Sequence, residues 1–188
     1  ILAEALTLFS TQGYVATSLA DIARASDISK AGLLHHYSSK DQLLAAVLDE
    51  RDRRTIVRLP RADAGAAAAL DAWVEMVSHN QRHPDGVALY TAMSAAVIDA
   101  THQAHPWFRQ HLMDAIAYLT SAFEHGKQTG EVREEAPSEQ IARRLVALSD
   151  GLQVQWLCSR AQGGPTINMH EVMAGVVVDL KERWLLDS

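Results

Sequence analysis

The sequence has little cysteine, few aromatic residues and no long apolar run. Cys158 is the single cysteine, so the chain cannot form an internal disulfide and is compatible with a reducing cytoplasm. We expect its thiol to be buried rather than redox-sensing. Charges interrupt every apolar stretch before the roughly 20 residues that a bilayer span needs, so we predict no membrane span. At 188 residues the chain can bury a core without covalent cross-links.

Patterns typical of enzymes and metal sites are also missing. The chain has no G-x-S-x-G, H-E-x-x-H, Walker or G-x-G-x-x-G motif, so we expect neither catalysis nor a cofactor. His79 with His83, and His102 with His105, have spacings that can begin a metal site. No cysteine or carboxylate is clearly placed to complete either one, so we predict no bound metal.

The net charge of −6 is unevenly distributed along the chain. Residues 1–58 carry equal numbers of bases and acids, whereas residues 59–188 carry the whole acidic excess. A neutral segment can still bind phosphates if its cations share one face, but the charge itself gives no support for a nucleic-acid partner. The sequence begins at Ile1, already inside an amphipathic pattern, so we expect further residues before it in the natural protein.

Apolar residues recur with helical spacing throughout, which predicts an all-α protein. A first helix should end near Gly13, where glycine suits a helix C-terminus. Pro60 favours a break after the fourth helix, and we therefore predict domains over residues 1–54 and 55–188. The expected later helices cover 19–25, 29–36, 40–54, 66–79, 86–103, 106–127, 138–158 and 169–186.

Two short predicted helices, joined by Ser26-Asp27-Ile28, fit a helix-turn-helix. The segments GYVATSLADIA (13–23) and SKAGLLHHYSSKDQLL (29–44) resemble the signature of the TetR (tetracycline repressor-like) family nearly position by position. This resemblance implies a three-helix DNA-binding domain followed by a helical domain for ligand binding and dimerisation. It also implies a cytoplasmic, ligand-responsive transcriptional regulator, by default a repressor that a small apolar or amphipathic effector releases from operator DNA.

The same resemblance implies which residues contact DNA. Ser18 would offer its backbone N–H and hydroxyl to one phosphate, and Lys40 would hold another. Lys30 would donate to guanine, and Ala31 would contact a thymine methyl. Leu34 departs from the aromatic residue that the family often has, which removes one polar contact. The full predicted set is Thr17, Ser18, Ser29, Lys30, Ala31, Gly32, Leu34, His35, His36, Tyr37 and Lys40.

For the end of the second helix we favour a phosphate contact by His36. His35 and Tyr37 can each contact DNA or simply pack against the first helix, and the sequence leaves both alternatives open.

The second predicted domain supplies two further residue sets, for each of which ordinary core packing is the alternative. The ligand pocket is assigned to Trp73, Met76, Leu89, Met93, Val97, Ile116, Leu119, Phe123, Leu152 and Trp156. The interface of a homodimer is assigned to Ile141, Leu145, Leu148, Leu152, Val172, Met173, Val176, Leu180 and Trp184.

A second function also fits the sequence: a helical protein-interaction module that has lost operator binding. Leu34 and the neutral first domain both suit that alternative, because each weakens the expected attraction to DNA.

Overall fold

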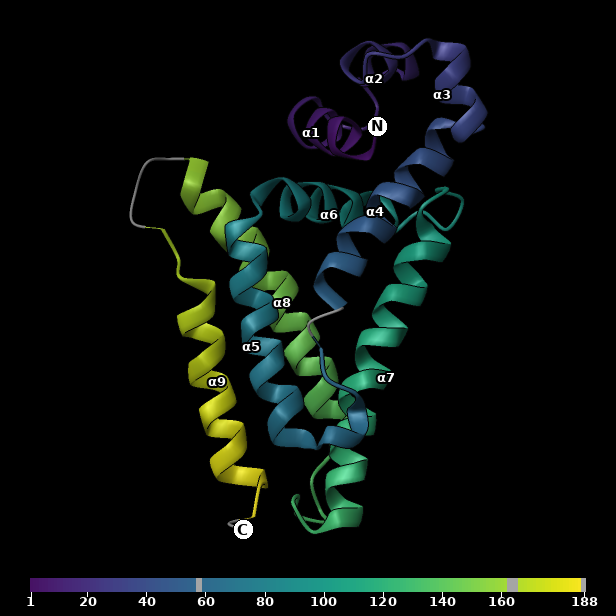
Figure 1. Cartoon of the computed structure of the whole chain (residues 1–188). Helices are drawn as coiled ribbons and strands as arrows, with labels where there is room; N and C mark the ends of the chain where they lie inside the picture. The colour runs from purple at the N-terminus through teal and green to yellow at the C-terminus, as the bar shows by residue number, and fades with distance from the viewer. Residues whose placement is uncertain (57–58, 162–165, 187–188) are drawn as a thin grey trace. The chain divides into compact units, whose positions relative to one another are not determined.

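The computed structural model describes residues 1–56, 59–161 and 166–186, and the prediction of an all-α protein is confirmed (Figure 1). Within these ranges the only β-type pairing is an isolated bridge between Val132 and Leu185. The helices are α1 (Leu2–Gln12), α2 (Leu19–Ala25), α3 (Lys30–His36), α4 (Lys40–Ile56), the short 3-10 helix η1 (Ala62–Ala64), α5 (Ala66–Arg82), α6 (Pro84–Ala96), α7 (His105–Thr129), α8 (Ser138–Ala161) and α9 (Met169–Trp184).

Most helix ends lie where local capping chemistry predicts them. The side-chain oxygens of Ser18 and Ser29 accept backbone N–H groups at the starts of α2 and α3. Gly13 follows α1 with a φ of 85°, and Asp27 takes a φ of 54° in the turn between α2 and α3. Glycine adopts such angles without strain, and aspartate is among the few other residues that tolerate them.

One predicted helix is too long. The segment expected as a single helix over 86–103 ends at Ala96, and turns occupy 97–104. The Asp99 carboxylate accepts the backbone N–H and the hydroxyl of Thr101, at 2.8 and 2.7 Å. Such local side-chain bonds compete with helical hydrogen bonds, which explains why the apolar periodicity of this segment was misleading.

The helices form two compact units. The first contains residues 1–54 and 83–108, and the second contains residues 55–82 and 109–188. The boundary expected after residue 54 coincides with one border of these units. Residues 83–108, which the sequence analysis assigned to the second domain, instead pack with the N-terminal helices. Contacts between segments so far apart in the chain leave no local signal in the sequence.

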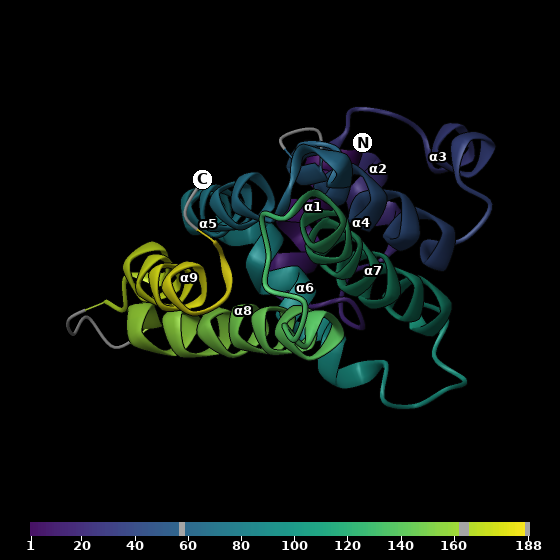
Figure 2. The ribbon, with the colours of Figure 1, turned by 90° about the horizontal axis from the view of Figure 1, so that it is seen from below.

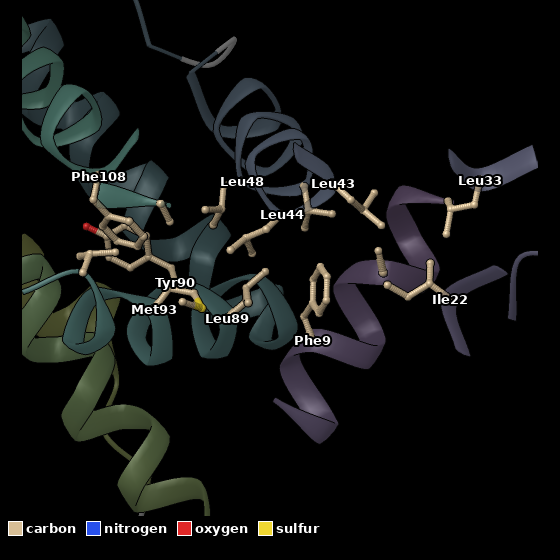
Figure 3. Packing of buried hydrophobic residues seen from close by; sticks show 14 of the residues in the cluster. Phe9, Ile22, Leu33, Leu43, Leu44, Leu48, Leu89, Tyr90, Met93 and Phe108 are labelled. Atoms are coloured by element: carbon tan, nitrogen blue, oxygen red, sulfur yellow. The ribbon is translucent and has the colours of Figure 1, made fainter. Parts of the chain in front are cut away.

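A continuous apolar cluster forms the core of the first unit (Figure 3). Phe9 of α1, Ile22 of α2 and Leu33 of α3 join it from the N-terminal side, while Leu89 and Met93 of α6 extend it. Full burial of one such side chain contributes about 1.5–3 kcal/mol. The cluster therefore fixes α2 and α3 on α1, α4 and α6.

In the second unit, α9 packs along α5 and α8 (Figures 1 and 2). The Lys181 ammonium contacts the Asp71 carboxylate at 2.6 Å, near the start of α5. Near the other end of α5, the Gln81 amide oxygen accepts the backbone N–H of Met169 at 2.8 Å. These two contacts show that α5 and α9 run antiparallel.

Two sequence expectations about the surface can be compared with the structure. Cys158 is exposed on α8, so the expectation of a buried thiol is wrong. The sulfur lies on a face of α8 that nothing in the described part of the chain covers. None of the helices within 1–56, 59–161 and 166–186 is long and apolar enough to cross a membrane.

Candidate nucleic-acid interface

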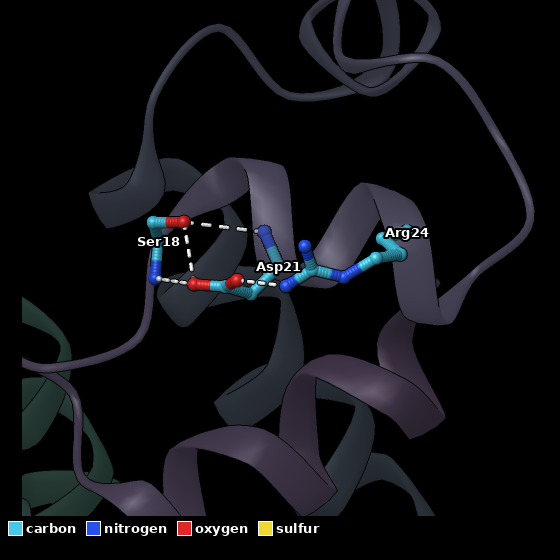
Figure 4. A network of polar contacts seen from close by, with 3 residues as sticks. All are labelled: Ser18, Asp21 and Arg24. Carbon is cyan, nitrogen blue, oxygen red and sulfur yellow. Dashed lines mark hydrogen bonds and ion pairs between the residues drawn. The ribbon is translucent and has the colours of Figure 1, made fainter.

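A capping box closes the N-terminus of α2 (Figure 4). The Ser18 hydroxyl accepts the Asp21 N–H at 3.2 Å and donates to the Asp21 carboxylate at 2.6 Å, and the Ser18 N–H donates to the same carboxylate at 3.2 Å. These bonds, with the nearby Arg24 guanidinium, lower the pKa of Asp21. Both Ser18 groups that were expected to bind phosphate are therefore engaged by Asp21.

α3 is anchored by one residue and presents the others. Leu33 is its only buried residue and has no exposed surface. The Ser29 hydroxyl accepts the Gly32 N–H at 3.0 Å and so fixes the first turn. A Cβ atom on Gly32 would lie 3.3 Å from that hydroxyl, so glycine gives this cap room. Ser29 is exposed, as are the predicted base-contacting or backbone-contacting residues Lys30, Ala31, Leu34, His35 and His36.

Lys40 and Thr17 hold the loop between α1 and α2. The Lys40 ammonium donates to the carbonyls of Tyr14 and Thr17, at 2.9 and 3.0 Å, and lies 4.4 Å from the centre of the Tyr14 ring. Thr17 is buried, and its hydroxyl donates to the Gly13 carbonyl at 2.9 Å. Lys40 is half-buried, with its ammonium held by the Tyr14 and Thr17 carbonyls. Both residues position the start of α2.

Tyr14 is a structural residue of this region that sequence reasoning missed. Its hydroxyl donates to the Asp41 carboxylate, and its ring contacts Phe9 with the ring centres 5.3 Å apart. Burial and the Asp41 carboxylate raise the pKa of Tyr14, so the phenol stays protonated. An aromatic residue directly after a helix-ending glycine is the signal that could have indicated this role.

The end of α3 separates the three residues that the sequence left ambiguous. Tyr37 is half-buried and packs against the apolar cluster of the first unit, which matches the packing alternative. His35 and His36 are exposed, with ring centres 5.8 Å apart. The two histidines thus remain candidates for contacting DNA.

The predicted pocket residues are divided between the two units. Leu89, Met93 and Val97 belong to the apolar cluster of the first unit, where they pack with Phe9 and its neighbours. Met76 and Ile116 are half-buried in the second unit. The remaining members are buried in the second unit: Trp73, Leu119, Phe123, Leu152 and Trp156.

The nine predicted dimer residues differ in burial. Val172 is the exposed exception, with 41% of its surface accessible. Leu148, Val176, Leu180 and Trp184 are half-buried. The other four predicted residues are buried within their own chain: Ile141, Leu145, Leu152 and Met173.

A different face of α8 is available to a partner. Ala147, Val154 and Cys158 are exposed, Gly151 lies between them, and a Cβ atom on Gly151 would meet nothing within 4 Å. Their spacing of four, three and four residues places them on one stripe. The sequence analysis overlooked this stripe because it looked for large apolar residues; small residues at heptad spacing were the available signal.

Within the described ranges, no three or more His, Cys, Asp or Glu side chains are grouped so that they can hold a metal ion. His102 and His105 serve the turn after α6. The Nδ1 atom of His102 accepts the Ala104 N–H at 3.1 Å, and the Nδ1 atom of His105 lies 2.8 Å from the Val97 carbonyl oxygen.

The arrangement of α2 and α3 defines a helix-turn-helix protein. Residues 1–47 match the family model described as "Bacterial regulatory proteins, tetR family". Residues 1–47 thus carry a domain similar to the DNA-binding part of this family.

Two curated relatives each match a part of the chain. One is the biofilm operon icaADBC HTH-type negative transcriptional regulator IcaR of Staphylococcus epidermidis, to which the chain is 44% identical over 43 residues. These 43 residues make up 23% of each protein. The other is the HTH-type transcriptional repressor Rv3405c of Mycobacterium tuberculosis, to which the chain is 39% identical over 66 residues. These 66 residues make up 35% of each protein. The chain thus spans about a quarter to a third of the length of these relatives.

Solved structures match nearly the whole fold. A TetR transcription regulator from Haloarcula marismortui has a TM-score of 0.79 at 21% identity, with 98% of each chain covered. The regulator FadR from Bacillus subtilis, in complex with stearoyl-CoA, has a TM-score of 0.79 at 13% identity, with 96% of this chain and 95% of that chain covered. At these identities the likeness establishes the fold alone.

Proposed function

We propose that this protein is a ligand-responsive, DNA-binding transcriptional regulator, and specifically a repressor that a small apolar or amphipathic effector releases from its operator. The observation that carries the proposal is the presentation of α3. Leu33 anchors this helix, while Lys30, Ala31 and His35 face solvent. A helix fixed in this way can enter the major groove with its N-terminal side chains against the bases.

Each exposed residue of α3 suits a particular contact. The Lys30 ammonium can donate to guanine O6 and N7, which discriminates by about 1–3 kcal/mol when the geometry is good. Ala31 can contact a thymine methyl, and Leu34 offers van der Waals contact only. His36, when it donates to a phosphate, would help to set the register on DNA without reading sequence. DNA binding would place this activity in the cytoplasm.

Repressors of this kind act as two-fold dimers, and we assign the interface to the outward stripe of α8 together with α9. Val154 and Cys158 of α8 and Val172 of α9 are each exposed, and a Cβ atom on Gly175 of α9 would meet nothing within 4 Å. An isologous dimer would present two α3 helices to half-sites roughly 34–36 Å apart. Small residues at such a stripe allow helices to approach each other closely.

The dimer proposal can be tested by Val154→Arg. A buried charge without a partner is strongly unfavourable, so we expect sedimentation velocity to show a monomer at concentrations at which the unmodified chain is a dimer. Met113→Arg is the matched control, because Met113 is similarly exposed, at 49%, but lies on α7. Dissociation by both variants, or by neither, would argue against this interface.

Ligand response is proposed from the second unit and from its structural relatives. FadR was solved with stearoyl-CoA, and a regulator from Saccharomonospora viridis with choline. In this chain, Trp73, Phe123 and Trp156 form part of a buried interior that also contains polar groups. Some conformations of a dimer place the two α3 helices where they do not fit adjacent major grooves. An effector that binds such a conformation more tightly must weaken DNA binding, typically by ~1–3 kcal/mol.

Fluorescence anisotropy would test DNA binding, with duplexes from upstream of the protein's own gene and a scrambled duplex at the same salt concentration. We expect selective binding that Lys30→Ala weakens about tenfold, which corresponds to roughly 1.4 kcal/mol. Arg109→Ala is the matched control, because it removes one exposed positive charge from α7. Equal, weak binding to both duplexes would instead favour the helical interaction module.

A further inference from the structure

Gln153 is a buried polar residue of α8 whose side-chain oxygen has no hydrogen-bond partner in the described part of the chain. Only 6% of the residue's surface is exposed. It follows Ser149 by one turn and precedes Trp156 by three residues, so these three side chains share one face of the helix. A buried amide oxygen without a donor loses its hydration and gains nothing in exchange.

The neighbouring polar groups do not supply the missing bond. The Trp73 indole N–H donates to the Ser149 hydroxyl at 3.1 Å, and that hydroxyl donates to the Leu145 carbonyl at 2.9 Å. This chain of hydrogen bonds joins α5 to α8 and is complete in itself. Gln153 lies one turn beyond it, on the same face of α8, with its oxygen unused.

Another glutamine of the same unit shows the usual alternative. The Gln81 amide oxygen accepts the backbone N–H groups of Met169 and His170, at 2.8 and 3.4 Å, and so caps α9. Gln81 therefore contributes to the fold through its oxygen, whereas Gln153 does not. Two further buried polar atoms of this unit, the Tyr118 and Thr120 hydroxyls on α7, also have no partner among the described residues.

The surroundings of Gln153 define the kind of molecule that would complete it. The buried residues nearest to it along α8, Ser149, Leu152 and Trp156, are uncharged. The half-buried Asp150, one turn before it, already has an interaction within the chain. A charged ligand group would need an opposite charge to offset its desolvation. A carbonyl oxygen accepts hydrogen bonds and cannot donate them.

We propose that the Gln153 side-chain oxygen accepts a hydrogen bond from the effector, and that the effector is an uncharged molecule with a hydroxyl or amide N–H on an apolar body. This inference rests on the proposed function, in which the second unit senses a small molecule. The unpaired oxygen destabilises the unliganded protein and gains its bond only when such a donor binds.

The first experiment needs no ligand. Gln153→Met removes the unpaired amide at similar length, so we expect the midpoint of thermal unfolding of the full chain to rise. Gln81→Met removes the cap of α9, so we expect the midpoint to fall. Gln155→Met, two residues away on the exposed side of α8, should leave the midpoint unchanged. A fall with Gln153→Met, of the size found with Gln81→Met, would show that the Gln153 oxygen serves the fold and would overturn the proposal.

The second experiment measures ligand preference by tryptophan fluorescence of the full chain. Decanol and methyl nonyl ether are isomers, but only decanol donates a hydrogen bond. We expect the unmodified chain and Gln155→Met to bind decanol about tenfold more tightly than the ether, and Gln153→Met to bind both within about twofold. Equal binding by the unmodified chain, a preference that survives in Gln153→Met, binding of neither isomer, or tighter binding of decylammonium would each overturn the proposal.

DNA binding, measured on the same preparations, separates this inference from the function on which it rests. Selective DNA binding without a Gln153-dependent preference for decanol would overturn the inference and leave the regulator proposal intact. A Gln153-dependent preference without DNA binding would support the ligand site and count against the regulator.

Discussion

The hairpin of α2 and α3 and the interior of α8 use polar residues in opposite ways. In the hairpin, the hydroxyls of Ser18 and Ser29 cap α2 and α3 by accepting backbone N–H groups. In α8, the Gln153 oxygen is buried and has no hydrogen-bond partner among the residues that the structure describes. Completed caps fix a short helix in one position, as a surface that reads DNA requires. A buried polar group without a partner lowers the stability of the fold, but the same group can form a hydrogen bond with a ligand. The hairpin is thus suited to holding an exposed helix rigidly, whereas the interior of α8 is suited to binding a ligand.

The largest predicted effect concerns the apolar packing that holds α3 in the first unit. Leu33→Ala leaves a cavity beneath α3 and should lower the free energy of unfolding by about 2–5 kcal/mol. Leu34→Ala is the matched control, because Leu34 is 38% exposed and its truncation should cost less than about 0.5 kcal/mol. Urea denaturation followed by circular dichroism would measure both. Equal losses would mean that α3 is not held by Leu33 alone.

A smaller effect is expected where the second unit does have a completed polar contact. The Glu131 carboxylate accepts the backbone N–H groups of Ala66 and Ala67, at 2.9 and 2.8 Å, and so caps α5. A Cβ atom on Gly65 would lie 2.5 Å from that carboxylate, and Gly65 has a φ of 99°. Gly65→Ala should therefore cost about 1–3 kcal/mol.

Gly130→Ala is the control for this prediction, since Gly130 has a φ of 79° but open space around its Cα. It carries only the backbone cost, so it should destabilise the chain less than Gly65→Ala. Thermal unfolding of the two variants, compared at equal pH, would decide. Equal shifts would show that the contact with Glu131 contributes little beyond the backbone.

The smallest expected effect is a pH dependence of stability that tests the capping box of α2. The Ser18 hydrogen bonds lower the pKa of Asp21 in the folded protein below its unfolded value. Its contribution to stability is therefore present above the unfolded-state pKa and is lost as the pH falls through the lower folded-state pKa. The unfolding midpoint of the unmodified chain should exceed that of Asp21→Asn at neutral pH, and the two should converge in acid. A gap that stays constant as the pH falls would count against the capping box.

Local chemistry made most helix boundaries predictable. Ser18 and Ser29 cap α2 and α3 through bonds to residues three positions away, so the capping signal lies entirely within a few residues of sequence. Prediction failed after α6, because the apolar spacing continued through Val97 while the Asp99 side chain closed a turn.

The candidate site was less predictable. The pattern of residues 13–44 located α3 and its exposed N-terminus, but it assigned Lys40 to a phosphate. The Lys40 ammonium instead binds carbonyls of residues more than twenty positions earlier in the chain. A lysine at a helix start looks the same in the sequence whether it points outward or folds back.

The sequence by itself determined the all-α class, the helix-turn-helix and the resemblance of residues 13–44 to the TetR signature, because helix periods, caps and turns depend on neighbours within a few residues. Tertiary structure alone decided that residues 83–108 join the N-terminal unit and that Ile141 and Leu145 are buried. It also decided that the Gln153 oxygen finds no partner within 1–56, 59–161 and 166–186. The physical reason is that apolar burial has no preferred direction. A helix with two possible contact faces buries whichever one its distant neighbours reach, and only the folded chain determines which neighbours those are.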